Sequence, residues 1–304
     1  MLEMKYNILI DPGYLLDKNR KNLPMTADAY TAAVRSVIAD LLTSQTGKVI
    51  LHTLSLWHGW VRISPPDVTD SCPGALTDKA SNEDLQRYKL TRDMTWLPEF
   101  IRRPVKSVIL FVPQQWAAGG GCHKKYTDKS AANYVTSDYS PTVAATLLHE
   151  LVHSVRFVSK TFVMNAPETF PGTRLNVYDQ EEEFNAVMVE NIYQSETKSN
   201  IRNSHHGFNT LESQLQNSFE FYKVSKKAFF AVDKFCAANP HFTRRLCAIK
   251  VPFNPIAAYY HDKKKCESFS NTVEAARRDN VLLQLFSAIT PGFPPNAWDF
   301  LLTH

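Results

Sequence analysis

The segment TLLHELVHSVR, from Thr146 to Arg156, constrains the fold of this 304-residue chain more than any other. Apolar residues surround its polar positions His149, Glu150 and His153, and it contains no proline. This pattern favours a helix that is apolar on both sides of its polar residues, and Pro141 just ahead suits a first helical turn. We therefore expect a buried helix over residues 142–157 in which those three side chains are polar for a reason other than solubility.

The spacing of the three polar residues indicates a metal site. His149 and His153 are four positions apart, so their imidazoles face the same side of a helix and can bind one ion. Glu150 is rotated by about 100° around the helix axis, which brings its carboxylate near the open position of that ion. There it can take a proton from water and deliver it to a leaving amine. The pattern predicts one Zn²⁺ per chain, with Glu150 as the general base.

A catalytic zinc site needs a third protein ligand. A third histidine on the same helix is disfavoured, because Arg156 and Phe157 stand where the longer motif has glycine. The expected helix over residues 180–196 instead offers carboxylates, at Glu181, Glu182, Glu183 and Glu190.

Among these carboxylates we expect Glu183 to be the third ligand. Ala186, one turn further on, is small enough to let this helix pack closely against the motif helix. Glu182 is the alternative ligand, and Glu190 is expected to hydrogen-bond a ligand histidine. Glu181 fits a charged first helical turn.

Hydrolysis through such a site also needs a donor for the oxyanion of the tetrahedral intermediate. The candidates are His205, His206, Tyr178 and Tyr193, of which we assign His206 and Tyr178 to the catalytic set. Arg202 is expected either to pair with a carboxylate of the ligand helix or to bind a substrate carboxylate.

These residues carry a family resemblance. HELVH followed by a Glu-x-x-Ala helix is similar to the gluzincin branch of the zincins. LLHELVHSVR, EEEFNAVMVENIYQSE and NIRNSHHGF together resemble the zinc metallopeptidase domains of bacterial secreted effectors and polymorphic toxins. The resemblance covers about residues 141–210 and implies His149, His153 and Glu183 as ligands and Glu150 as base. The chain departs from the best-known gluzincins in the thirty positions between His153 and Glu183.

The rest of the chain predicts an α+β fold with a small sheet packed on the motif helix. Strands are expected over residues 5–10, 48–56, 57–63 and 107–112, and a helix over 27–42 with Thr26 as its N-cap. After residue 211 helices dominate, over 211–235, 242–251 and 272–286. We expect a catalytic domain over 1–207 and a helical subdomain over 208–304 that closes the active-site cleft.

Composition narrows the function classes. A net charge of +4 is too small to argue for nucleic-acid binding, and no apolar run reaches the roughly 20 residues of a membrane span. The five cysteines are widely spaced without a CxxC pair, so we expect reduced thiols and no cysteine-bound metal. The N-terminus is a poor signal peptide, so we expect cytoplasmic synthesis. Delivery to a host or rival cell by a specialised secretion system is what the resemblance to secreted effectors implies.

The leading hypothesis is a zinc endopeptidase of the effector or toxin type. Its partners would be a protein or peptide substrate and an immunity protein or secretion chaperone. The alternatives are a hydrolase of peptidoglycan peptides and a non-enzymatic helical interaction protein with a structural or vestigial zinc site.

Overall fold

The computed structural model describes residues 3–12, 25–65, 76–79, 105–123, 142–162, 181–203, 205, 210–224 and 227–271. Within these ranges a small sheet is combined with a larger set of helices, which confirms the predicted mixture of α and β structure. The expected helix over 272–286 lies outside the described residues.

The sheet has four strands in the order β1-β2-β4-β3. Three short apolar strands, β1 (Ile8–Ile10), β2 (Trp60–Ser64) and β4 (Val105–Leu110), run parallel. Strand β3 (Leu76–Lys79) pairs antiparallel with β4 at the edge. Two parallel neighbours need a crossover connection, and α1 (Ala27–Leu41) and α2 (Gln45–Ser55) supply it between β1 and β2.

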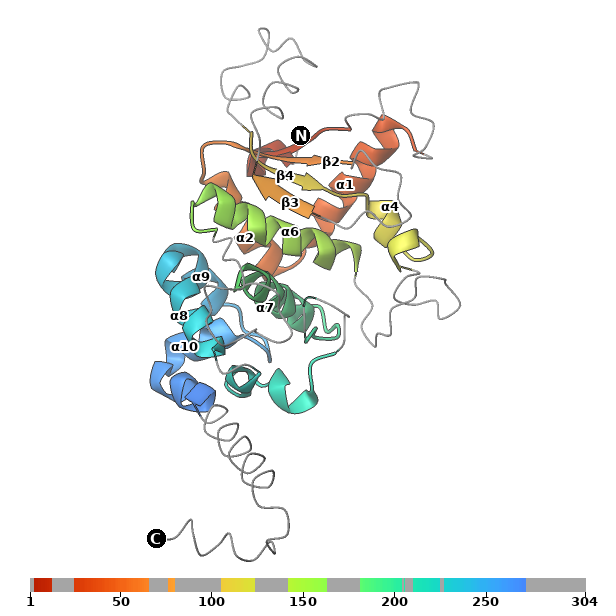
Figure 1. Ribbon diagram of the computed structural model, residues 1–304. Helices are drawn as coiled ribbons and strands as arrows, with labels where there is room; N and C mark the ends of the chain where they lie inside the picture. The colour runs from red at the N-terminus through yellow and green to blue at the C-terminus, as the bar shows by residue number, and fades with distance from the viewer. Residues whose placement is uncertain are drawn as a thin grey trace, which may run out of the picture.

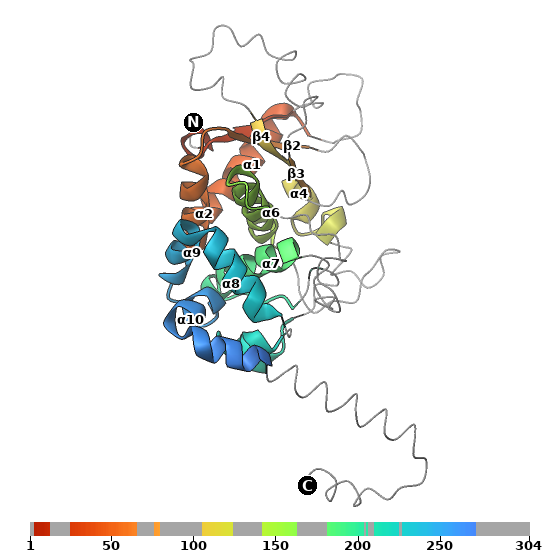
Figure 2. The ribbon, with the colours of Figure 1, turned by 60° about the vertical axis from the view of Figure 1, so that its left-hand side comes forward.

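Helix α6 (Val143–Val158) lies at the centre of the molecule and carries the motif. It packs against β3 and β4 on one side and against α7 (Glu181–Glu196) on another, with α1 and α2 beside it. Figures 1 and 2 show the sheet, α6, α7 and the C-terminal helices following one another across the molecule. One buried core runs continuously from β1 to α10, so α6 is enclosed by protein on nearly every side.

The C-terminal part is helical but more broken than predicted. The expected helix over 211–235 is two short 3-10 turns followed by an α-helix. In place of single long helices the chain forms η5 (Ser213–Gln216), η6 (Glu220–Lys223), α8 (Ala228–Ala238), α9 (Pro240–Cys247) and α10 (Pro255–His261). The shorter elements outside this part are η1 (Glu3–Tyr6) and α4 (Pro113–Trp116).

The prediction of a strand over 48–56 is wrong, because α2 occupies this segment. Its β-branched and apolar residues favour a strand locally, but side chains from distant segments satisfy both helix ends. At the N-terminal end the Glu196 carboxylate accepts hydrogen bonds from Gln45 N, from Thr46 N at 2.9 Å and from the Thr46 hydroxyl at 2.8 Å. At the C-terminal end Asn7 Nδ2 donates to the carbonyls of Leu54, at 3.0 Å, and Trp57, at 2.7 Å.

The expectation that every cysteine is reduced is also wrong, since the buried Cys122 is disulfide-bonded. Cys236, Cys247 and Cys266 are free thiols. No helix of the described residues is long and apolar enough to cross a membrane.

The contact between Glu196 and α2 predicts a stability effect. Replacing Glu196 with Gln removes a charged acceptor from three donors at a helix N-terminus, and we expect the free energy of unfolding to fall by about 1–2 kcal/mol. Urea denaturation monitored by circular dichroism measures this change. Glu267→Gln, on an exposed carboxylate, is the matched control and should change stability by less than about 0.5 kcal/mol. Equal effects of the two substitutions would contradict the prediction.

Candidate metal centre

The motif helix forms for local reasons that the sequence made visible. The Thr142 hydroxyl accepts a hydrogen bond from Ala145 N at 3.1 Å and caps the first turn of α6. The apolar residues of α6 between Ala144 and Val155 are buried around its whole circumference. His149, Glu150, His153 and Arg156 are buried as well, each with no more than 6% of its surface exposed. Buried polar groups require partners, and α7 supplies most of them.

The three carboxylates that open α7 point in different directions, because successive helical residues are rotated by about 100°. Glu181 turns away from α6 to accept a hydrogen bond from Lys234 of α8 at 2.9 Å. Glu182 pairs with Arg156 of α6, at 2.6 and 2.8 Å from Nε to its two oxygens. Of the three, Glu183 is the one whose carboxylate lies beside both motif histidines.

Three potential ligand atoms meet between α6 and α7. His149 Nε2 lies 3.1 Å from His153 Nε2 and 3.1 Å from Glu183 Oε2. His153 Nε2 is 3.4 Å from the same carboxylate oxygen. The two nitrogens and the oxygen therefore form a nearly equilateral triangle with edges between 3.1 and 3.4 Å.

The hydrogen bonding of His149 shows why this triangle needs a positive charge. His149 Nδ1 lies 3.1 Å from Glu190 Oε2, a carboxylate oxygen that can only accept, so Nδ1 is assigned the proton. A neutral imidazole protonated at Nδ1 presents a lone pair at Nε2. That lone pair faces the carboxylate of Glu183, which also only accepts. A proton or a metal ion must lie between such groups for them to share a buried site.

The pKa values reflect the same demand in the metal-free protein. Burial lowers the pKa of His149, but its hydrogen bonds to Glu183 and Glu190 outweigh burial, and the pKa lies above its usual value. Burial likewise opposes protonation of His153, while Glu182, Glu183 and the charge of Glu150 raise its pKa to about 10. Burial raises the pKa of Glu183, but both histidines hold it well below its usual range.

Each motif histidine is backed by a carboxylate of α7 and an arginine. Behind His149, Glu190 accepts from Arg202 Nη1 at 3.0 Å. Behind His153, Glu182 Oε1 lies 3.6 Å from Nδ1, which is an ion-pair distance and too long for a hydrogen bond, and it pairs with Arg156. Carboxylates in these positions orient imidazoles and make them better metal ligands.

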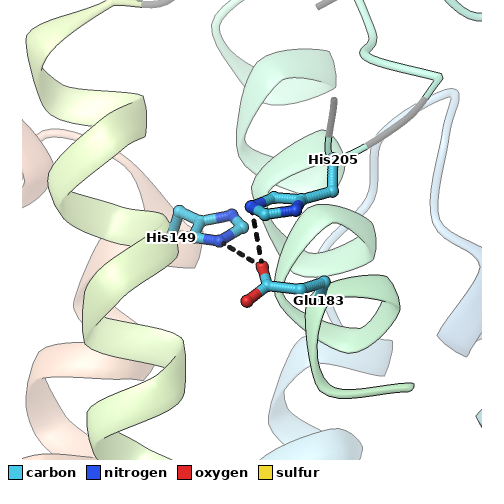
Figure 3. A group of neighbouring side chains, drawn as sticks. All are labelled: His149, Glu183 and His205. Carbon is cyan, nitrogen blue, oxygen red and sulfur yellow. Dashed lines mark hydrogen bonds and ion pairs between the residues drawn. The ribbon is translucent and has the colours of Figure 1, made fainter. Parts of the chain in front are cut away.

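A third histidine borders the triangle. His205 Nε2 lies 3.3 Å from Glu183 Oε2, and its ring is stacked parallel to that of His149 with centroids 6.0 Å apart. His149, Glu183 and His205 place ligand atoms within 4.8 Å of one another. Figure 3 shows the two histidine rings and the Glu183 carboxylate turned toward one another. Two overlapping triads therefore share His149 and Glu183, one completed by His153 and the other by His205. His153 Nε2 is close to both of the other ligand atoms, at 3.1 Å from His149 Nε2 and 3.4 Å from Glu183 Oε2, so we take the first triad as the core of the site.

The structure thus brings together the predicted His149, Glu150, His153 and Glu183, with Glu190 and Arg202 behind them. The predicted catalytic residues His206 and Tyr178 lie outside the described residues. Tyr193 is on α7 but ten residues from Glu183, about 15 Å along the helix. It therefore lies near the C-terminal end of α7, where burial and then the charges of Asp40 and Glu196 raise its pKa.

Sequence reasoning missed the pairing of Arg156 with Glu182. A basic residue one turn beyond His153, in a helix that is otherwise apolar, was the available signal, because a buried arginine requires an acidic partner. His205 was among the donor candidates, but its position beside Glu183 was not predicted. The two adjacent histidines in SHHG do not show which of them faces the site.

Comparison with known proteins finds no match. No protein-family model, no curated protein and no solved structure matches this chain significantly. The resemblance to effector metallopeptidases therefore stays a prediction that rests on the motif residues.

The buried pair of Arg156 and Glu182 predicts a non-additive stability effect. Arg156→Met leaves the Glu182 carboxylate buried without this guanidinium, and we expect a loss of about 3 kcal/mol in the free energy of unfolding. Replacing both residues with Met also removes the buried Glu182 carboxylate, and the double variant should recover at least half of that loss. Thermal and urea unfolding of the two variants measures the difference. A double variant no more stable than Arg156→Met would contradict the pairing.

The raised pKa of His153 predicts how the metal-free protein depends on pH. A folded-state pKa of about 10, against about 6.5 when unfolded, means that the imidazolium stabilises the fold fully below pH 6.5. This contribution is lost as the pH rises through 10. After chelator treatment, the difference in unfolding free energy between wild type and His153→Ala should therefore shrink from pH 6 to pH 10. A difference that stays constant over this range would contradict the prediction.

Proposed function

We propose that this protein is a zinc-dependent peptidase whose metal is held by His149, His153 and Glu183 and whose general base is Glu150. The observation that best supports this proposal is the triangle of potential ligand atoms between α6 and α7. Zinc bonds of about 2.0–2.1 Å in a tetrahedral site separate neighbouring ligand atoms by about 3.3 Å. The observed edges of 3.1 to 3.4 Å fit that separation without rearrangement.

The charges around the triangle also fit a divalent cation. The described part of the site has four buried or partly buried carboxylates, those of Glu150, Glu182, Glu183 and Glu190. Their negative charge is partly neutralised by two guanidinium groups, those of Arg156 and Arg202. Neutral imidazoles leave an excess of two negative charges. A bound ion of charge +2 would balance this excess and replace the positive charge that protonated imidazoles supply in the metal-free protein.

The donor set favours zinc over the hard divalent ions Mg²⁺ and Ca²⁺. Two imidazoles and one carboxylate, arranged on one side of the site, form the ligand set of many catalytic zinc centres. Hard ions such as Mg²⁺ and Ca²⁺ prefer oxygen ligands, and two imidazole nitrogens disfavour them. Zinc bound here would polarise a carbonyl group and lower the pKa of a water molecule.

Glu150 is suited to the proton transfers of hydrolysis. It is buried on α6 next to His149 in the chain, and its negative charge contributes to the raised pKa of His153. A carboxylate here would take the proton from the attacking water and later deliver it to the leaving amine. Glu190 with Arg202, and Glu182 with Arg156, would keep the two imidazoles oriented during these steps.

An edge strand next to the motif helix supports a peptide as substrate. Within the described residues β3 pairs with β4 alone, so its second edge has no strand partner there, and it lies against α6. An extended peptide could add to that edge through backbone hydrogen bonds. Together with the motif resemblance, this leads us to propose a protein substrate in a host or rival cell.

A second candidate function is a purely structural metal site in an interaction protein. The proximity of His205 favours it, because structural zinc sites have four protein ligands and no open position. The presence of Glu150, which such a site would not use, favours the peptidase.

Metal analysis of the purified protein tests the proposal. We expect about one zinc per chain in wild type and a loss of at least tenfold in zinc affinity in His153→Ala and Glu183→Ala. Glu181→Ala is the matched control, since that neighbouring carboxylate points to Lys234 and should keep its zinc. Glu150→Gln should retain zinc while cleavage of a peptide library falls at least a hundredfold. A wild-type protein that takes up no zinc on titration would contradict the proposal.

A further inference from the structure

We propose that His205 is a fourth metal-binding side chain, and that it is the exchangeable one. In the resting protein it would occupy the solvent-facing position of the metal, and a substrate or inhibitor would displace it. This inference rests on the proposed zinc site of His149, His153 and Glu183 and adds to it a closed resting state.

The position of His205 matches that of a fourth ligand. Its Nε2 is 3.3 Å from Glu183 Oε2, the same separation as between the ligand atoms of the triangle. Its ring lies nearly parallel to that of His149, with an angle of 11° between the planes. Both rings direct a nitrogen at one carboxylate oxygen, which is visible in Figure 3. Two imidazole nitrogens that both approach the same carboxylate oxygen can join that oxygen as ligands of one ion bound between them.

Exposure distinguishes His205 from the other three groups. Its side chain is 29% exposed, against 7% for His149, 6% for His153 and 20% for Glu183. Solvent therefore reaches the site from the side of His205. An exposed ligand can leave for water at little cost, whereas the two buried histidines cannot. His205 is thus the ligand that an incoming molecule would replace.

Arg202 holds the His205 segment in place and connects it to the buried part of the site. One of its guanidinium nitrogens, Nη2, donates to the carbonyl of His205, while Nη1 pairs with Glu190 behind His149. The backbone of Arg202 is itself fixed by Asn191 of α7, through hydrogen bonds of 2.7 and 2.8 Å. The ring of His205 can swing about its own side-chain torsions while its backbone stays attached to α7.

Four protein ligands leave no open position, and hydrolysis requires one. With His205 bound, the metal would be shielded from water and from non-specific reaction. A substrate that presents its carbonyl to the site would take the position of His205, so the site would open only when occupied. The displaced imidazole would remain close enough to hydrogen-bond the bound substrate.

X-ray absorption at the zinc edge tests this proposal directly, because multiple scattering counts coordinated imidazoles. Zinc-loaded wild type should show three imidazoles, and His205→Ala should show two with a water in place of the third. Addition of acetohydroxamate to wild type should reduce the count from three to two without removing zinc. His241→Ala, which removes an exposed histidine of α9, is the control and should keep three.

The wild-type count decides the inference even if His205→Ala loses its metal. Two imidazoles in zinc-loaded wild type would overturn it and leave the peptidase site intact, with His205 reduced to a hydrogen-bond donor. Three imidazoles in both wild type and His205→Ala would also overturn it, because another histidine would then be the third. Three imidazoles that acetohydroxamate fails to displace would overturn the exchangeable role. A wild type that binds no zinc would instead contradict the proposed function itself.

Discussion

The buried contact between α6 and α7 is the constraint on which the rest of the structure depends. It places carboxylates, imidazoles and guanidinium groups in the interior, where an unpaired charge costs several kcal/mol. Each group is tolerated because another one lies beside it: Glu182 with Arg156, Glu190 with Arg202 and Glu183 with the two histidines. The site is therefore an electrostatic unit: removing one charged group leaves its partner buried without a counter-charge, which destabilises the fold.

The two arginines fix the orientation of the carboxylates and, through them, of the histidine rings. His149, Glu190 and Arg202 form one chain of contacts, and His153, Glu182 and Arg156 form a second. Buried ion pairs of this kind add little net stability compared with apolar residues of similar size. Their effect is on orientation, because a carboxylate fixed by an arginine fixes in turn the ring that it contacts. If the proposed metal binds, side chains that are already held in place would reduce the entropy lost on binding.

Helix α7 links this site to the rest of the fold. Its N-terminal turn supplies Glu183 and its middle supplies Glu190, while Glu196 at its last position caps α2. Phe184 of the same helix packs against Phe221 of η6, and Glu181 pairs with Lys234 of α8. The helix that would complete the proposed metal site is thus the one that connects the crossover helices to the C-terminal part.

Much of the site could be predicted from residues close together in the sequence. The four-residue spacing of His149 and His153 and the cap at Thr142 are local features, so helix α6 and the common face of its histidines follow from the chain itself. The choice of Glu183 among the acidic residues of the second helix also rested on a local feature, the small Ala186 one turn on, and the structure turns that carboxylate to the histidines.

Only the tertiary structure decided the features that depend on distant segments. Residues 48–56 favour a strand by composition, but Glu196 and Asn7 cap a helix there from 150 and 47 residues away. The partner of Arg156 and the approach of His205 depend on how α6, α7 and the segment after α7 pack together. The sequence by itself determined a helix with two histidines that can share an ion. The fold decided which charges surround the two histidines, because long-range packing, unlike helical spacing, leaves no periodic trace in the chain.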